Sequence, residues 1–342
     1  MTSAHVVRIA EKRKVARQNK RECSKSNAVT PLTDDVLLQI HCNRLAAMER
    51  RRKHRGVTLR LEILNAHPRD SRISFQEETH IYTLDGQIEF PLSVSGVWPQ
   101  FFDPVDMDQT VVKYFGRWSC DSSSKYHAII CDSRLIGLSD DQIMQNIAES
   151  WRGIGRIASQ KGTYMHRQIE LFLNGQESDE SNAEMTQFKR YMIEVAQDNS
   201  WAPFRTEWSI FDETRMIAGQ VDCIFKHIDK EEYHMVDWKR CAKPLDRTTG
   251  EMYGRFGIAP CNFLVDNSWS HYAAQQNLYA AILQDKYALM LSSMSLLQLH
   301  ENQNTYKLIP IPNFFDVACE MLNSCKKGKS SFNSNVEEVS SM

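Results

Sequence analysis

No run of apolar residues in this 342-residue chain approaches the roughly 18 that a membrane span requires, and no secretory apolar stretch follows its first residues. No CxxC pair is present either. The nine cysteines, an odd number without repeated spacing, favour free thiols in a reducing compartment over a disulfide framework. The nucleophile motifs of serine hydrolases and cysteine proteases are also missing. We therefore expect an intracellular protein with no membrane partner.

Charge is distributed unevenly along the chain, although the net charge is only -2. Residues 1–60 hold 15 Lys/Arg and 5 Asp/Glu, whereas the remaining 282 residues hold 26 and 38. Such a basic arm indicates attraction to a polyanion or a localisation signal, and the alternative is a solvated tail. We expect nuclear localisation if the source is eukaryotic, whereas Glu11 and Glu22 weigh against a mitochondrial address.

Local patterns predict the elements that follow the arm. Alternating polar and apolar residues around the Asp85-Gly86 turn indicate a β-hairpin between Ser74 and Leu92. Ser139 is a candidate cap for one helix, and a second helix should begin near residue 162 and stop at Asn174-Gly175. A third helix is expected around 188–195.

The second half of the chain predicts three successive strands, a long irregular segment, a helix and a final strand pair. The strands are expected at about 206–211, 216–225 and 232–239, and the irregular segment at 240–268. The helix is expected at 271–287 and the final strand pair at 296–300 and 306–312. This order predicts an α/β fold with a mixed α+β sheet flanked by helices. The expected parts are a partly helical or disordered basic arm at 1–68, a β-hairpin and helical part at 69–135, a core at 136–326 and a disordered tail at 327–342.

Two charged side chains share one face of a predicted strand. In EYHMVDWK, Asp237 and Lys239 project to one side, while Val236 and Trp238 project to the other. Asp222 interrupts the apolar run of the preceding strand, where an unpaired carboxylate is costly to bury. Adjacent antiparallel strands would bring the two aspartates together, and a cation would offset their repulsion. Hard oxygen ligands favour Mg²⁺ or Mn²⁺.

Two helical pairs of polar residues accompany these strands. His166 and Glu170 are four residues apart, as are Gln275 and Tyr279, so each pair lies on one face of its helix. Either pair alone is also typical of a solvated helix surface.

Taken together, the motifs resemble the RecB-like and lambda-exonuclease-like branch of the PD-(D/E)xK nucleases, whose motif order is H, E, GxxD, (D/E)xK and QxxxY. The matching segments are, in order, GTYMH ending at His166, FRTEW with Glu207, GQVD ending at Asp222, DWK from Asp237 to Lys239, and QQNLY from Gln275 to Tyr279. The resemblance covers about residues 150–312 and includes Tyr272 as the first residue of YxxQxxxY. It implies a restriction-endonuclease-like core behind an N-terminal hairpin and the basic arm.

The resemblance also implies roles for residues at the metal. Asp222 and Asp237 would be metal ligands together with the backbone carbonyl of Trp238. Lys239 would position or activate the attacking water. His166 would lie at the metal or at the scissile phosphate.

Other matching positions have roles that vary among relatives. Glu170 and Glu207 are candidate catalytic residues of this kind, and Gln275 and Tyr279 would orient the catalytic helix or contact the nucleic acid. Some relatives carry an iron-sulfur cluster on one upstream and three downstream cysteines, but only two cysteines follow Tyr279 here. We therefore expect Mg²⁺ or Mn²⁺ as the cofactor and no iron-sulfur cluster.

The segment after the DWK motif combines cations with aromatic residues, which suits phosphates and stacked bases. Its candidate nucleic-acid contacts are Arg240, Lys243, Arg247 and Arg255. The alternative is a flexible solvated loop. A zinc site built from Cys223, His227, His234 and Cys241 has spacings unlike those of closed structural sites.

From these residues we expect a deoxyribonuclease, an exonuclease or end-dependent enzyme of DNA replication, repair or recombination. Its partner would be single-stranded or end-containing DNA, with a helicase or another replication or repair protein as a further partner. The alternatives are an endonuclease, an RNase, and a nucleic-acid-binding module that lacks catalysis.

Overall fold

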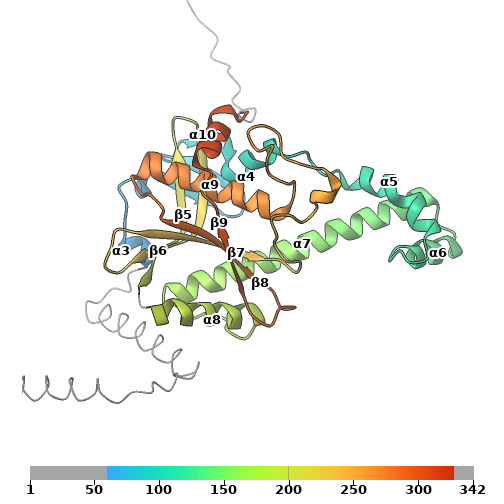
Figure 1. Cartoon of the computed structure of the whole chain (residues 1–342), viewed down its shortest axis with the longest axis horizontal. Helices are drawn as coiled ribbons and strands as arrows, with labels where there is room; N and C mark the ends of the chain where they lie inside the picture. Colours follow the sequence, from blue (N-terminus) through green and yellow to red (C-terminus); the bar gives the residue numbers. More distant parts are fainter. Residues whose placement is uncertain (1–59, 199, 327–342) are drawn as a thin grey trace, which may run out of the picture.

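The computed structural model describes residues 60–198 and 200–326 and has mixed α/β architecture, with helices on both sides of a mixed sheet (Figure 1). The predictions for residues 1–59 of the basic arm and for the tail at 327–342 lie outside the described residues. Within the described residues, no helix is both long and apolar enough to cross a membrane.

A small antiparallel sheet opens the described part of the chain. It follows helix α3 (Leu61–Leu64) and the 3-10 turn η1 (Asp70–Arg72), and consists of β1 (Ile73–Gln76), β2 (Ile81–Leu84) and β3 (Ile88–Glu89). Asp85 and Gly86 have φ angles of 51° and 71°, which is the left-handed geometry of a tight hairpin turn, so the predicted hairpin is confirmed. Leu61 is buried in one of the hydrophobic core clusters, together with Ile169 and Trp238, so the packed body includes a residue that we assigned to the arm.

A group of helices projects from one side of the body (Figure 1). The chain reaches it through β4 (Leu92–Ser93), α4 (Val94–Val97) and η2 (Trp98–Phe101), and the group consists of α5 (Met107–Cys120), α6 (His127–Leu135) and the first part of α7 (Asp140–Leu173). It has a small apolar core of its own that includes Val111, Phe115, Ile130 and Ile143.

Helix α7 is one continuous helix of 34 residues, whereas we predicted two helices. Its predicted ends are confirmed, because Ser139 and Gln142 form a capping box and Asn174 follows the last helical residue. Gly153, Gly155 and Gly162 lie inside this helix and do not interrupt it. Added Cβ atoms at Gly155 and Gly162 would meet nothing within 4 Å, and glycine lowers helix stability without ending a helix.

The main sheet contains the three predicted central strands and the predicted final pair. Its members besides β4 are β5 (Trp201–Asp212), β6 (Ile217–His227), β7 (Tyr233–Arg240), β8 (Ser293–Leu299) and β9 (Lys307–Ile311). The order is β4-β6-β7-β8-β9, and β5 pairs with the other edge of β6. Only β4 with β6 and β7 with β8 run parallel.

Helices cover both faces of this sheet (Figure 1). The second half of α7 and helix α8 (Ala183–Asp198) pack on the face that carries Val236 and Trp238. Helices α9 (Ser268–Tyr287) and α10 (Phe315–Ser324) pack on the face that carries Met235. Since side chains alternate along a strand, Asp237 and Lys239 project from the face opposite Val236 and Trp238, as predicted, and α9 covers that face.

The edge of β6 that pairs with β4 and β7 has a stretch between these two strands without a described strand partner, which we call the opening. Leu92 and Ser93 of β4 pair with residues 217 and 218, and β7 pairs with residues 223 to 226. No described strand pairs with residues 219 to 222 on that edge. An irregular segment that contains the short 3-10 turn η3 (Glu251–Tyr253) follows β7 in the chain and leads to α9.

Candidate metal centre

The ladder between β6 and β7 ends at the two aspartates of the predicted site. Cys223 pairs with Val236, so Asp222 and Asp237 are the next positions on the two strands. Instead of a further backbone bond, Oδ2 of Asp222 accepts a hydrogen bond of 2.8 Å from the backbone N–H of Trp238. The Asp222 side chain thus takes the place of a backbone hydrogen-bond acceptor where the two strands separate.

Glu207 faces the opening from β5. Thr206 pairs with Cys223 and Trp208 with Val221, so Glu207 is opposite Asp222. Its φ angle is 45°, a left-handed conformation that is uncommon for a residue with a side chain and that accumulates at functional sites.

His166 approaches the same point from α7. Its Nε2 lies 2.9 Å from the carbonyl oxygen of Trp238, which can only accept, so Nε2 carries the hydrogen. The Nδ1 atom lies 3.5 Å from Asp222 Oδ2 and 3.7 Å from Glu207 Oε1. A backbone carbonyl that orients an imidazole in this way is typical of metal-binding histidines.

His166, Glu207 and Asp222 form the one group of three metal-capable side chains that the described residues contain, with ligand atoms within 4.8 Å of one another. Trp238 contributes its carbonyl as the acceptor for His166, and its predicted coordination of the metal stays a prediction. The residues of the zinc alternative form no such group among the described residues, and Cys223 is a fully buried core thiol.

Asp237 and Lys239 form a buried ion pair beside this group. Lys239 Nζ lies 2.7 Å from Asp237 Oδ2, and their side chains are 15% and 5% exposed. Asp237 Oδ2 is thus held by the ammonium, whereas the buried Glu207 Oε1 has no hydrogen bond among the described residues and lies 3.7 Å from His166 Nδ1. Buried carboxylate oxygens without hydrogen bonds are costly, and a divalent cation would satisfy them.

The electrostatics of the site favour positive charge. Burial by itself lowers the pKa of His166, but the carboxylates of Asp222 and Glu207 outweigh it and raise that pKa to about 9. Burial and the nearby Asp222 carboxylate raise the pKa of Asp237 to about 6, although Lys239 opposes the shift. Burial lowers the pKa of Lys239, yet Asp237 and Asp222 bring it above its usual value, so the ammonium stays charged.

Comparison of the chain with known proteins identifies no relative. No family model matches the chain, and no curated protein matches it. A functional assignment therefore depends on the chemistry of the site itself and on the order of its motifs.

Tyr279 of α9 packs on β6 at Gly219, next to the opening. Its ring packs so closely on Gly219 that an added Cβ there would lie 2.7 Å from Cε1 of Tyr279. Gln275 donates a hydrogen bond of 3.3 Å to the Tyr279 hydroxyl. Tyr279 is only 5% exposed, so of its two predicted roles the structure favours the orientation of the helix against β6 over direct contact with a nucleic acid.

Glu170 does not join the metal-capable group. It lies one turn after His166 on α7 and pairs with Arg167 at 2.5 Å. The i, i+4 spacing places Glu170 near His166 on the helix face, but of these two side chains only His166 joins the group with Glu207 and Asp222.

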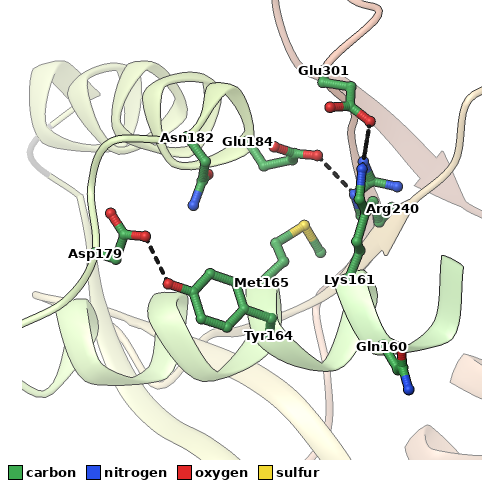
Figure 2. A pocket seen from close by; sticks show the side chains of 9 residues that line it. All are labelled: Gln160, Lys161, Tyr164, Met165, Asp179, Asn182, Glu184, Arg240 and Glu301. Atoms are coloured by element: carbon green, nitrogen blue, oxygen red, sulfur yellow. Dashed lines mark hydrogen bonds and ion pairs between the residues drawn. The ribbon is translucent and has the colours of Figure 1, made fainter. Parts of the chain in front are cut away.

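Arg240 is engaged elsewhere, which corrects its predicted contact with nucleic acid. Its guanidinium lies 2.7 Å from Glu184 of α8 and 2.7 Å from Glu301, in a polar pocket on the α8 side of the sheet, and Figure 2 shows both ion pairs. The side chain is only 8% exposed. Alternation along β7 explains the error, because Arg240 shares the face of Trp238 and not that of Lys239.

The other predicted cations lie on the folded segment between β7 and α9. Lys243 is exposed. Arg247 is exposed and lies over the ring of Trp269, with 5.6 Å to the ring centroid. Arg255 is half-exposed but pairs with Asp266 at 2.7 Å. Lys243 and Arg247 are therefore the cations of this set that remain open to an anionic ligand.

Sequence reasoning assigned no role to Tyr272, which the structure places at the site. Its ring centroid lies 4.6 Å from Lys239 Nζ. The signal was present in YxxQxxxY, because Tyr272 and Tyr279 are seven residues apart and share one face of α9.

Proposed function

We propose that this protein is a divalent-metal-dependent nuclease of the PD-(D/E)xK type that hydrolyses DNA phosphodiester bonds. The observation that carries the proposal is the opening between β6 and β7, where His166, Glu207 and Asp222 meet beside the Asp237–Lys239 pair. The order of the motifs, which resembles that of the RecB-like and lambda-exonuclease-like branch, supports the same function.

The side chains fit a divalent cation. Two carboxylates and one imidazole suit Mn²⁺ as well as Mg²⁺, and the oxygen of Glu207 that lacks a hydrogen bond is available as a ligand. When bound there, the ion supplies Lewis-acid polarisation of a phosphate oxygen and stabilises developing negative charge.

The protein's own residues hold charge and orientation around that point. Trp238 orients His166 through its carbonyl and Asp222 through its N–H, so one peptide segment aligns two candidate ligands. Lys239 keeps its proton and places a positive charge where the negative charge of a phosphoryl transition state would develop. Asp237 directs that ammonium through the 2.7 Å ion pair.

Single-stranded or end-containing DNA is the substrate that we propose, with exonuclease or end-dependent action in replication, repair or recombination. The support is chemical. Exposed Lys243 and Arg247 lie on the segment that follows β7, together with the exposed apolar side chains of Met252 and Phe256. Such a mixture suits phosphates and stacked bases.

Cleavage of end-labelled linear and circular oligonucleotides, single- and double-stranded, tests the proposal. With Mg²⁺ or Mn²⁺ present, linear substrates should be degraded, and chelation should stop the reaction. Lys239→Ala and Asp222→Asn should each lower the rate on the order of a thousandfold, about 4 kcal/mol of barrier. Lys113→Ala, on the exposed surface of α5, is the matched control. Rates of either site variant within threefold of wild type would refute the assignment, and binding without cleavage would indicate a non-catalytic module.

A further inference from the structure

Tyr272 and Lys239 meet across the gap between α9 and β7. The ring centroid of Tyr272 lies 4.6 Å from Lys239 Nζ, and the same ammonium lies 2.7 Å from Asp237 Oδ2. We propose that Tyr272 is a positioning residue that holds the Lys239 ammonium in its working direction through the face of its ring. This inference rests on the proposed nuclease function and adds a component to that site.

A lysine needs such a second contact. Its ammonium is a point charge on a flexible stem, so one carboxylate attracts it without defining the path of the side chain. The ring face of Tyr272 supplies a broad negative surface on which the ammonium can rest. Lys239 is only 15% exposed, and cation–π attraction is strongest where water is excluded. Together, the carboxylate and the ring define one direction for Nζ.

The ring of Tyr272, and not its hydroxyl, makes this contact. Among the described residues, this hydroxyl has a hydrogen-bond contact with Sγ of Cys241 at 3.9 Å, a weak interaction that either atom can donate. Phenylalanine would keep the ring face, whereas leucine would fill the space without it.

Helix α9 supports the two aspartate strands with one ring each. Tyr279 packs on Gly219 of β6, three residues before Asp222. Tyr272, two helical turns earlier, faces Lys239 of β7. The same helix therefore sets the position of a carboxylate strand and of the ammonium, and the loss of the Tyr272 ring should act on kcat through Lys239.

Steady-state kinetics of full-length Tyr272→Leu and Tyr272→Phe test this role. Tyr272→Leu should lower kcat roughly tenfold to thirtyfold while KM changes less than threefold, and Tyr272→Phe should restore most of the lost kcat. Tyr287→Leu removes a buried ring at the far end of α9 and should lower stability without this change in kcat. Equal kcat values for the Leu and Phe variants would overturn the proposal.

A double-mutant cycle separates positioning from general damage. In a Lys239→Ala background, Tyr272→Leu should have no further effect on kcat, because the group that it positions is gone. Multiplicative losses would show that Tyr272 acts independently and would overturn the proposal.

A readout without catalysis distinguishes this proposal from the nuclease assignment. In NMR spectra, the ring current of Tyr272 should shift the Lys239 ε-methylene protons upfield in the wild type and in Tyr272→Phe, but not in Tyr272→Leu. An inactive wild type with these shifts would refute the nuclease function and support the positioning contact. Absence of the shifts in an active wild type would refute the positioning contact alone.

Discussion

Replacing Gly219 by alanine should destabilise the protein, because β6 has no space for a Cβ at this position. The added carbon would lie 2.7 Å from Cε1 of Tyr279, 3.0 Å from Cγ2 of Val94 and 3.1 Å from Cβ of Val94. These neighbours are buried, with Val94 fully enclosed and Tyr279 5% exposed, so neither can swing into solvent. Overpacking of this kind costs about 1–3 kcal/mol.

Thermal unfolding followed by circular dichroism measures this cost. A protein of this size loses about 2 °C in Tm for each kcal/mol, so a fall of roughly 2–6 °C is expected. Cleavage activity should fall as well, because Asp222 lies three residues further along the same strand. Displacement of β6 would move its carboxylate away from His166 and Glu207.

Gly155→Ala is the matched control for the same chemical change. Gly155 lies on the exposed middle of α7, where an added Cβ would meet nothing within 4 Å. Alanine is a better helix former, so this variant should gain about 0.5–1 kcal/mol. If Gly219→Ala unfolds at or above the wild-type Tm, the close approach of Tyr279 to β6 does not limit this position, and our account of the glycine in the GQVD motif is wrong.

Three further predictions concern the charges around the site. Arg240→Ala should cost about 3–5 kcal/mol in urea unfolding, because it leaves the carboxylate of Glu184 buried without its partner, and the salt dependence of DNA binding should stay that of the wild type. A loss of DNA affinity without a loss of stability would contradict this. His166→Ala should weaken Mn²⁺ binding in calorimetry at least tenfold, and unchanged affinity would remove His166 from the ligand set. Lys243→Ala should reduce the slope of log affinity against log salt by about 1, whereas an unchanged slope would exclude a phosphate contact at this lysine.

Local sequence patterns predicted the strands of the main sheet and the two faces of β7. The alternation in EYHMVDWK separated Asp237 and Lys239 from Val236 and Trp238, and the structure has that separation. The same rule, applied one residue further, would have placed Arg240 on the opposite side from Lys239. The prediction divided α7 into two helices, one with Ile143, Ile147 and Trp151 and one beginning near residue 162, whereas the structure has one continuous helix that packs at both ends.

Only the tertiary structure decided which residues meet. The sequence determined that Asp222, Asp237 and Lys239 lie on strands and that His166 lies on a helix, because these are local periodicities of 2 and 3.6 residues. Contacts between segments far apart in the chain decide the rest. They determine where the β6–β7 ladder ends, which side of α7 reaches the opening and which ring of α9 contacts Lys239. Local pattern carries no information about those distances, so the exclusion of Glu170 and Arg240 and the addition of Tyr272 required the folded molecule.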